Sequence, residues 1–71
     1  MQPTAHTLGA TIRAEMGRQR ISMLELARRT GVARSTLTYQ IDKDVLTVAN
    51  LILIAQALSV TAATLIGEQA A

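Results

Sequence analysis

The side chains best suited to chemistry with a partner lie in one polar segment, residues 34–41. Leu37 and Ile41 have the spacing to face the core from a helix here. The outward arc of that helix then carries four polar side chains: Arg34, Ser35, Thr38 and Tyr39. A guanidinium donates two parallel hydrogen bonds to guanine, hydroxyl groups bond bases or phosphates, and a tyrosine ring contacts thymine methyl groups. These residue types predict contacts with base edges in the major groove of double-stranded DNA.

Three further basic residues flank this segment and are predicted as weaker contacts to DNA phosphates: Arg28, Arg29 and Lys43. Arg28 and Arg29 end the preceding helix, where basic side chains also bond the last carbonyl groups of a helix. Both interpretations of these two arginines stay open. Arg34 differs from them, because no carboxylate lies three or four residues away to pair with it. The absence of such a carboxylate favours a role for Arg34 in binding DNA.

The distribution of charge divides the chain into two halves. All seven basic residues lie between positions 13 and 43, and the net charge of the chain is +2. After Asp44 the only charged residue is Glu68. A basic first half beside an apolar second half predicts one surface that faces a polyanion and one that packs against protein. Arginines that are merely solvated are the alternative interpretation.

The polar segment is positioned by two short helices joined by a tight turn, residues 22–41. Ser22 is placed to cap the first helix, and Glu25, three residues later, to complete a capping box. Gly31 follows the last apolar position, where helices commonly end in the left-handed conformation that glycine adopts most easily. Two helices this short, with one glycine between them, predict a helix-turn-helix.

Apolar periodicity and capping residues predict an all-α fold with five helices: residues 8–19, 23–29, 34–41, 48–58 and 62–66. Gly67 is expected to close the last helix. The predicted organisation is a loose N-terminal tail at 1–6, one compact domain at 7–67 and a C-terminal tail at 68–71. The domain is small, with 71 residues in the whole chain, so its core must be densely aliphatic or supported by oligomerisation.

The sequence resembles the lambda-type repressor and Cro family (XRE-like) of helix-turn-helix proteins. The motif residues that carry the resemblance are Leu26, Ala27, Gly31, Val32 and Leu37, and the stretches LGATIRAEM and TVANLILIAQALSV match the family's first and fourth helices. The resemblance covers residues 8–67. It implies a lambda-repressor-like fold, with base-reading positions at Arg34, Ser35 and Tyr39. It also implies DNA binding as a dimer, with the C-terminal helices in contact.

Three residues depart from the family pattern. Met23 stands where many members have a glutamine that contacts phosphate and braces the recognition helix. Ala33 stands where a capping serine or threonine is usual, so the helix from Arg34 is expected to begin without a side-chain cap. Gln40 occupies a position that is often apolar, and Ile41 substitutes for it one residue later.

No combination of residues predicts catalysis or a cofactor. The chain has one histidine and no cysteine, and it has neither a carboxylate pair on an apolar wall nor a glycine-rich phosphate loop. We therefore expect no enzyme activity and no bound metal, cofactor or small-molecule ligand. Without a signal peptide or a long apolar span, the protein is expected in the cytoplasm, associated with the nucleoid and not with a membrane.

The helix from residue 48 carries more apolar residues than its core face needs. Four residues make an adequate inward stripe: Leu51, Ile54, Ala55 and Leu58. Ile52 and Leu53 are left on faces that are normally polar. We interpret these two residues, together with the last helix, as a homodimer interface. In the alternative, the last helix and tail cover them within one chain.

These features together predict a sequence-specific regulator of transcription. It is expected to be a Cro-like or immunity-type repressor that binds a two-fold operator as a homodimer. Two alternatives stay open: an antitoxin whose apolar helix surface holds a toxin, and a protein-interaction module that kept the fold without DNA binding. Salt-dependent binding to mixed-sequence DNA separates the last of these from the other two.

Overall fold

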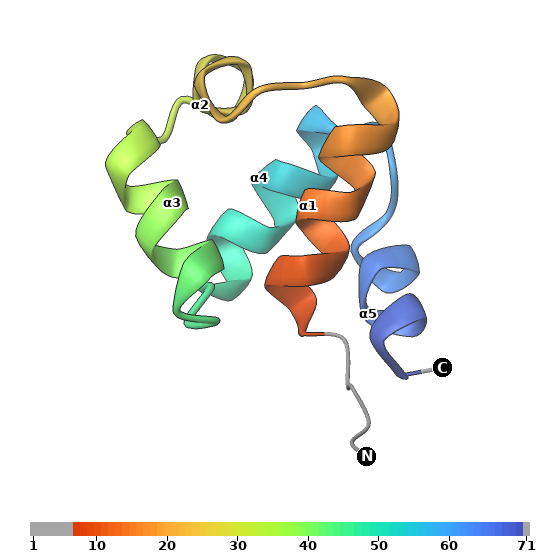
Figure 1. Cartoon of the computed structure of the whole chain (residues 1–71). Coiled ribbons are helices and arrows are strands. Elements are labelled where there is room, and N and C mark those ends of the chain that lie inside the picture. The colour runs from red at the N-terminus through yellow and green to blue at the C-terminus, as the bar shows by residue number, and fades with distance from the viewer. Residues whose placement is uncertain (1–6, 71) are drawn as a thin grey trace.

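The computed structural model describes residues 7–70, and of residues 68–70 only the backbone. Within that range it contains five α-helices and no strand (Figure 1): α1 Leu8–Gln19, α2 Met23–Thr30, α3 Arg34–Asp42, α4 Val48–Ala57 and α5 Ala62–Ala70. The prediction of an all-α fold is confirmed. The N-terminal tail predicted at residues 1–6 lies outside the described residues, as does residue 71.

Hydroxyl side chains start four of the five helices. Thr7, Ser22 and Thr47 each accept a hydrogen bond from the backbone N–H three residues later, at 3.0–3.1 Å, and Thr61 does the same at 3.0 Å. α3 is the exception, because Ala33 offers no side-chain acceptor, as its sequence predicts. Each hydroxyl satisfies an N–H that the first turn of a helix leaves without a partner.

The capping box predicted at the start of α2 forms only in part. Ser22 Oγ accepts a hydrogen bond from the N–H of Glu25 at 3.0 Å. The carboxylate of Glu25, however, accepts hydrogen bonds from Arg28 and Arg29, and no described bond joins it to the N–H of Ser22. Each arginine adds the attraction of a full positive charge to its hydrogen bond with the carboxylate, whereas a backbone N–H carries only a partial charge. The two arginines therefore take the carboxylate.

The predicted end of the last helix is wrong. α5 continues through Gly67 to Ala70, so residues 68–70 are helical and do not form the predicted C-terminal tail. Gly67 does not have a positive φ, in contrast to Gly31 at φ +77°. A glycine ends a helix where the backbone turns left-handed; elsewhere it lowers helix propensity by about 1 kcal/mol and the helix continues. The other helix ends lie within one residue of their predicted positions.

Aliphatic side chains from all five helices meet in one core. Six of them are almost completely buried, at 0–1% exposure: Ile12, Leu26, Leu37, Ile54, Leu58 and Leu65. Full burial of one such side chain contributes about 1.5–3 kcal/mol. The inward stripe predicted for α4 is confirmed, because all four of its residues belong to this core. α5 closes the core by packing against α1 and α4 (Figure 1).

α1 and α3 approach each other closely at Gly9, which is buried. A Cβ atom at Gly9 would lie 2.3 Å from the carbonyl oxygen of Ile41, so only a residue without a side chain fits there. Farther along α1, Arg13 forms an ion pair with Asp42, the last residue of α3. These two contacts hold the C-terminal half of α3 against α1. Neither is visible in the sequence pattern.

Candidate nucleic-acid interface

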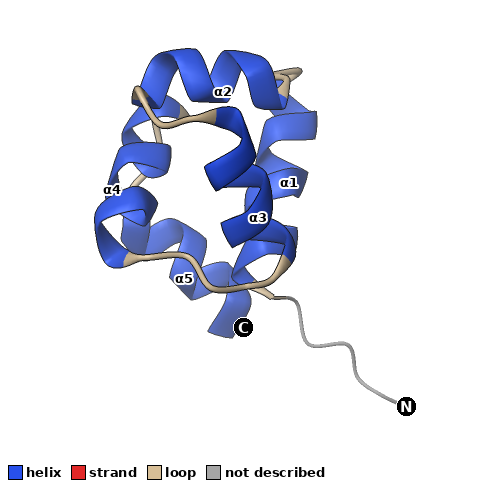
Figure 2. Cartoon of the chain, turned by 90° about the vertical axis from the view of Figure 1, so that its left-hand side faces the viewer, coloured by secondary structure: helices blue, strands red, loops and turns tan. Residues whose placement is uncertain are grey.

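The turn between α2 and α3 consists of three residues held by hydrogen bonds. Gly31 ends α2, and its N–H donates to the carbonyl of Ala27 at 2.9 Å. Thr30 Oγ1 donates to the carbonyl of Leu26 at 2.9 Å and accepts a bond from the N–H of Val32 at 3.2 Å. These bonds set the direction in which α3 leaves α2. In Figure 2, α2 crosses the upper end of α3, and α3 lies on the near side of the molecule.

One side of α3 is buried and the other is exposed. Leu37 and Ile41 face the core at 0% and 3% exposure, as predicted. The predicted contact residues Arg34, Ser35 and Tyr39 are exposed, Tyr39 at 60%, whereas Thr38 is half-buried. Thr36 is also exposed and was not among the predicted contacts. Its position one residue before the buried Leu37, away from the core stripe, is the signal that points to it.

Arg34 occupies the first position of α3. It is exposed and forms no ion pair with a described carboxylate. The ion pairs of the described residues all involve other arginines. The N–H groups of the first turn of α3 also lack a side-chain acceptor at Ala33. A cationic side chain next to open N–H groups at a helix start favours an anion such as phosphate or an electronegative base edge.

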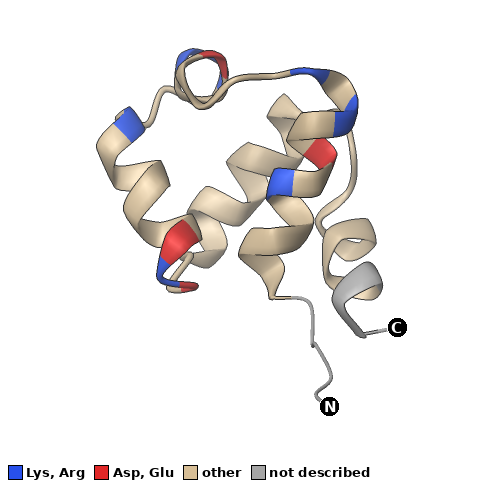
Figure 3. Cartoon of the chain, in the orientation of Figure 1, with Lys and Arg blue, Asp and Glu red and all other residues tan. Residues whose placement is uncertain are grey.

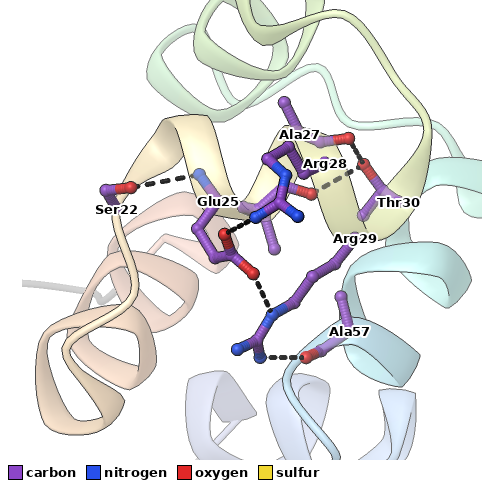
Figure 4. Close-up of polar contacts among 8 residues, drawn as sticks. Ser22, Glu25, Ala27, Arg28, Arg29, Thr30 and Ala57 are labelled. Atoms are coloured by element: carbon purple, nitrogen blue, oxygen red, sulfur yellow. Dashed lines mark hydrogen bonds and ion pairs between the residues drawn. The ribbon is translucent and has the colours of Figure 1, made fainter.

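Arg28 and Arg29 both pair with Glu25 on the same helix (Figure 4). Arg29 Nε donates to Glu25 at 2.9 Å, and its Nη1 donates to the carbonyl of Ala57, the last residue of α4, at 3.2 Å. Arg29 therefore ties α2 to the end of α4. The carbonyl that Arg29 bonds belongs to α4 and not to its own helix, where the helix-end interpretation expected it. The Arg28 side chain remains 71% exposed.

The electrostatic effect of this cluster appears at Glu25. The hydrogen bond from Arg29 is the main cause that holds the pKa of Glu25 below its ordinary value, and the positive charge of Arg28 lowers the pKa further. The carboxylate is consequently ionised at neutral pH and neutralises part of the charge of both arginines. This end of α2 is less attractive to a phosphate than two arginines in sequence suggest.

The loop after α3 carries the last charges before α5. Lys43 and Asp44 are exposed, and neither forms an ion pair with a described residue. Gln40 joins this loop to α4: its Oε1 accepts hydrogen bonds from Asn50 Nδ2 at 3.0 Å and from the N–H of Thr47 at 3.4 Å. The polar side chain of Gln40 thus has hydrogen-bond partners within this chain.

The outer face of α4 exposes apolar side chains. Ile52 is 46% exposed, so α5 does not cover it, whereas Leu53 is half-buried. Two residues that the sequence analysis did not select are more exposed still: Val45 at 51% and Val48 at 73%. Val48 lies one helical turn before Ile52, and that spacing was the available signal.

The charged residues are concentrated in one part of the molecule. In Figure 3 the charged residues lie on α1, α2 and α3 and in the loops beside them, while α4 carries none. This agrees with the division of the chain into a charged half and an apolar half.

Two further properties of the described residues bear on function. They contain no group of three or more histidine, cysteine or acidic side chains placed to hold a metal ion. None of their helices is both long and apolar enough to cross a membrane.

The chain has no match among family models, curated proteins or solved structures.

Proposed function

We propose that this chain is a sequence-specific DNA-binding regulator of transcription that places α3 in the major groove. It acts as a repressor, as a homodimer on a two-fold operator, in the cytoplasm at the nucleoid. The observation that carries the proposal is Arg34, an exposed guanidinium at the start of a helix with one exposed side, without an ion-pair partner among the described residues. Such a group is free to donate both hydrogen bonds to O6 and N7 of guanine.

The rest of α3 suits the same role. An α-helix fits the major groove of B-DNA, and the exposed side of α3 carries the small hydroxyls of Ser35 and Thr36 and the ring of Tyr39. The only acidic residue of α3 is Asp42 at its end, and Arg13 pairs with it. No unpaired carboxylate of α3 therefore repels the phosphates on either side of the groove. The resemblance to lambda-type repressors, which implies the same helix as the reader of bases, supports this assignment.

The phosphate contacts follow from exposure and pairing. The open N–H groups at the start of α3 are suited to a backbone phosphate. Arg28 is exposed enough to reach a second phosphate, at the cost of its bond to Glu25. Arg29 is held between Glu25 and α4, so we assign it to the fold and not to DNA.

A selection of bound sites from random DNA, followed by measurement of variants on the preferred site, tests the proposal. Arg34→Ala should weaken binding to that site by about 1–3 kcal/mol and relax the preference at one base position. Arg34→Lys should not restore binding fully, because an ammonium lacks the two-pronged geometry.

The matched control is Arg20→Asn, which removes the same charge from the turn between α1 and α2. Arg20 has φ 59°, a conformation that asparagine tolerates. This variant should keep the base preference of the wild type. If Arg34→Ala weakens binding to all sequences equally, Arg34 contacts phosphate and the assignment is wrong. A wild-type chain without salt-dependent affinity for mixed-sequence DNA would contradict the function itself and favour a protein-interaction module.

A further inference from the structure

The outer side of α2 carries an exposed leucine beside an exposed arginine. Among the described helices α2 packs only against α3 and α4, and its residues Leu26 and Ala27 face the core. On the other side, Leu24 is 56% exposed and the Arg28 side chain is 71% exposed. Leu24 and Arg28 are four residues apart, so they are neighbours on the side of α2 that points away from the core.

Arg28 uses only part of its guanidinium within the chain. Its Nη1 donates a hydrogen bond to Glu25 Oε1 at 2.5 Å, and this is the one side-chain bond of Arg28 among the described residues. A guanidinium has five N–H donors in a planar fork, so most of the fork stays open to solvent. Arg29 differs, because it bonds both Glu25 and the carbonyl of Ala57 (Figure 4).

The position of Glu25 shows which chemical group this side of α2 accepts. Its carboxylate lies between Arg28 and Arg29 and accepts a hydrogen bond from each (Figure 4). Glu25 is the only acidic residue of α2, so the two arginines leave one positive charge in excess. That excess is complementary to a second carboxylate. Arg28 is the arginine with open donors to bind it.

The leucine beside the open guanidinium favours a protein over a nucleic acid as the partner. DNA attracts such a surface through the charge of its phosphates, to which an apolar side chain adds nothing. A protein partner can cover Leu24 with an apolar side chain of its own, and the burial of apolar surface stabilises the contact.

We propose that Leu24 and Arg28 bind an acidic amphipathic helix of a partner protein. In such a helix an aliphatic side chain and a carboxylate lie four residues apart on one face. The same distance separates Leu24 from Arg28, so one turn of the partner places its aliphatic side chain on the leucine and its carboxylate on the arginine. This assigns Arg28 to a protein carboxylate in place of a DNA phosphate. The contact goes beyond the proposed function and leaves the exposed side of α3 free.

Titration with a synthetic peptide in the absence of DNA tests the contact. The probe is a fluorescently labelled peptide of about 20 residues, long enough to be helical in water, with leucines and glutamates four apart on one face. Fluorescence anisotropy should show that the full chain binds it with a Kd below about 1 mM. The same peptide with lysine in place of each glutamate should not bind.

Two variants with matched controls locate the binding surface. Leu24→Ala and Arg28→Gln should each weaken the binding of the acidic peptide about tenfold. Val48→Ala shortens an exposed apolar side chain on α4, and Arg20→Asn removes a positive charge from the turn between α1 and α2. Both controls should bind the peptide as the wild type does.

A gain of binding separates a charge contact from a loss of folding. Glu25→Gln removes the carboxylate that competes for Arg28, so this variant should bind the acidic peptide at least roughly threefold more tightly. Circular dichroism checks that each variant keeps its helices. If Leu24→Ala or Arg28→Gln unfolds, the gain in Glu25→Gln still decides.

The remaining outcomes overturn either this proposal or the proposed function. A wild-type chain that does not bind the acidic peptide, controls that lose as much affinity as Leu24→Ala, or no gain in Glu25→Gln overturns the contact. If Arg28→Gln weakens binding only to mixed-sequence DNA and not to the peptide, the arginine binds phosphate and the proposal is wrong. A chain that binds the peptide but has no affinity for DNA contradicts the proposed function and leaves the contact in place.

Discussion

Gly9 shows how much a single residue decides where two helices cross. Replacement by alanine would bring a Cβ atom to 2.3 Å from the carbonyl oxygen of Ile41, so α1 and α3 would have to move apart. Alanine favours a helix by about 1 kcal/mol over glycine, and the displacement must outweigh that gain. We expect Gly9→Ala to lower the free energy of unfolding by about 1–3 kcal/mol, measured by urea denaturation followed by circular dichroism.

Gly17 in the same helix is the matched control. A Cβ atom there would have no neighbour within 4 Å. Gly17→Ala should therefore raise the free energy of unfolding by about 0.5–1 kcal/mol through helix propensity. If both alanine variants raised or both lowered the free energy of unfolding, α1 and α3 would not approach each other as closely at Gly9 as described.

Glu25 gives the domain a pH dependence whose sign follows from its partners. The hydrogen bond from Arg29, and then the charge of Arg28, hold the pKa of Glu25 below its ordinary value in the folded chain. The ionised carboxylate thus stabilises the fold above its unfolded pKa of about 4.3, and this stabilisation is lost as pH falls through the lower folded pKa. Between about pH 4.5 and the acid limit, Tm should depend less steeply on pH in Glu25→Gln than in the wild type. Identical slopes would mean that the arginine cluster does not act on the carboxylate in solution.

At the scale of an element, the position of α3 depends on its buried side. Leu37 is fully buried, as is Leu26 of the neighbouring helix, and α2 and α3 pack against each other. Leu37→Ala should cost about 2–5 kcal/mol, which in a domain of this size unfolds most of the population. The control is the exposed Thr36→Ala, which should change stability by no more than about 0.5 kcal/mol. An unchanged Tm for Leu37→Ala would mean that α2 and α3 are packed differently.

Three helices in this chain end near residues other than glycine that adopt the left-handed conformation. Arg20, Asp44 and Ser59 all have φ of 58–59°, the left-handed conformation, and each directly follows or lies just beyond a helix. Glycine is the residue usually found at such positions. Among residues 7–70, glycine occupies only one of the left-handed positions, Gly31 between α2 and α3.

At the scale of the whole molecule, the proposed function predicts that self-association and operator binding are linked. One recognition helix covers too few base pairs for strong discrimination, so affinity for a two-fold site requires two copies held together. Ile52→Glu places like charges on both sides of the proposed homodimer interface at Ile52 and Leu53, and Ile52 is 46% exposed on α4. We expect a folded chain whose operator affinity falls at least roughly tenfold, while its weak, salt-sensitive affinity for mixed-sequence DNA is kept.

Titration of both DNAs at two salt concentrations, with circular dichroism as the check on folding, measures this link. Leu53 is left unchanged because it is half-buried, and a glutamate there would disturb the fold as well as the contact. A variant that binds the operator as tightly as the wild type would place the dimer contact elsewhere. One that is unfolded would show that Ile52 is needed by the monomer.

The sequence by itself determined the five helices, four of their caps and the aliphatic core. The signals for these features act within about one turn of the chain: a hydroxyl three residues before the N–H that it caps, and apolar residues four apart on one face. For the same reason the exposure of Arg34 and Tyr39 and the burial of Leu37 on α3 could be predicted without a structure.

The tertiary structure alone decided the contacts between residues far apart in the chain. Arg13 pairs with Asp42, Gln19 bonds the carbonyl of Leu58, and Arg29 bonds that of Ala57, across separations of 28 to 39 residues. The angles at which the helices cross decide which of these distant residues come within hydrogen-bonding distance. No local sequence pattern encodes those angles. The tertiary structure also shows that Val48, at the start of α4, is 73% exposed.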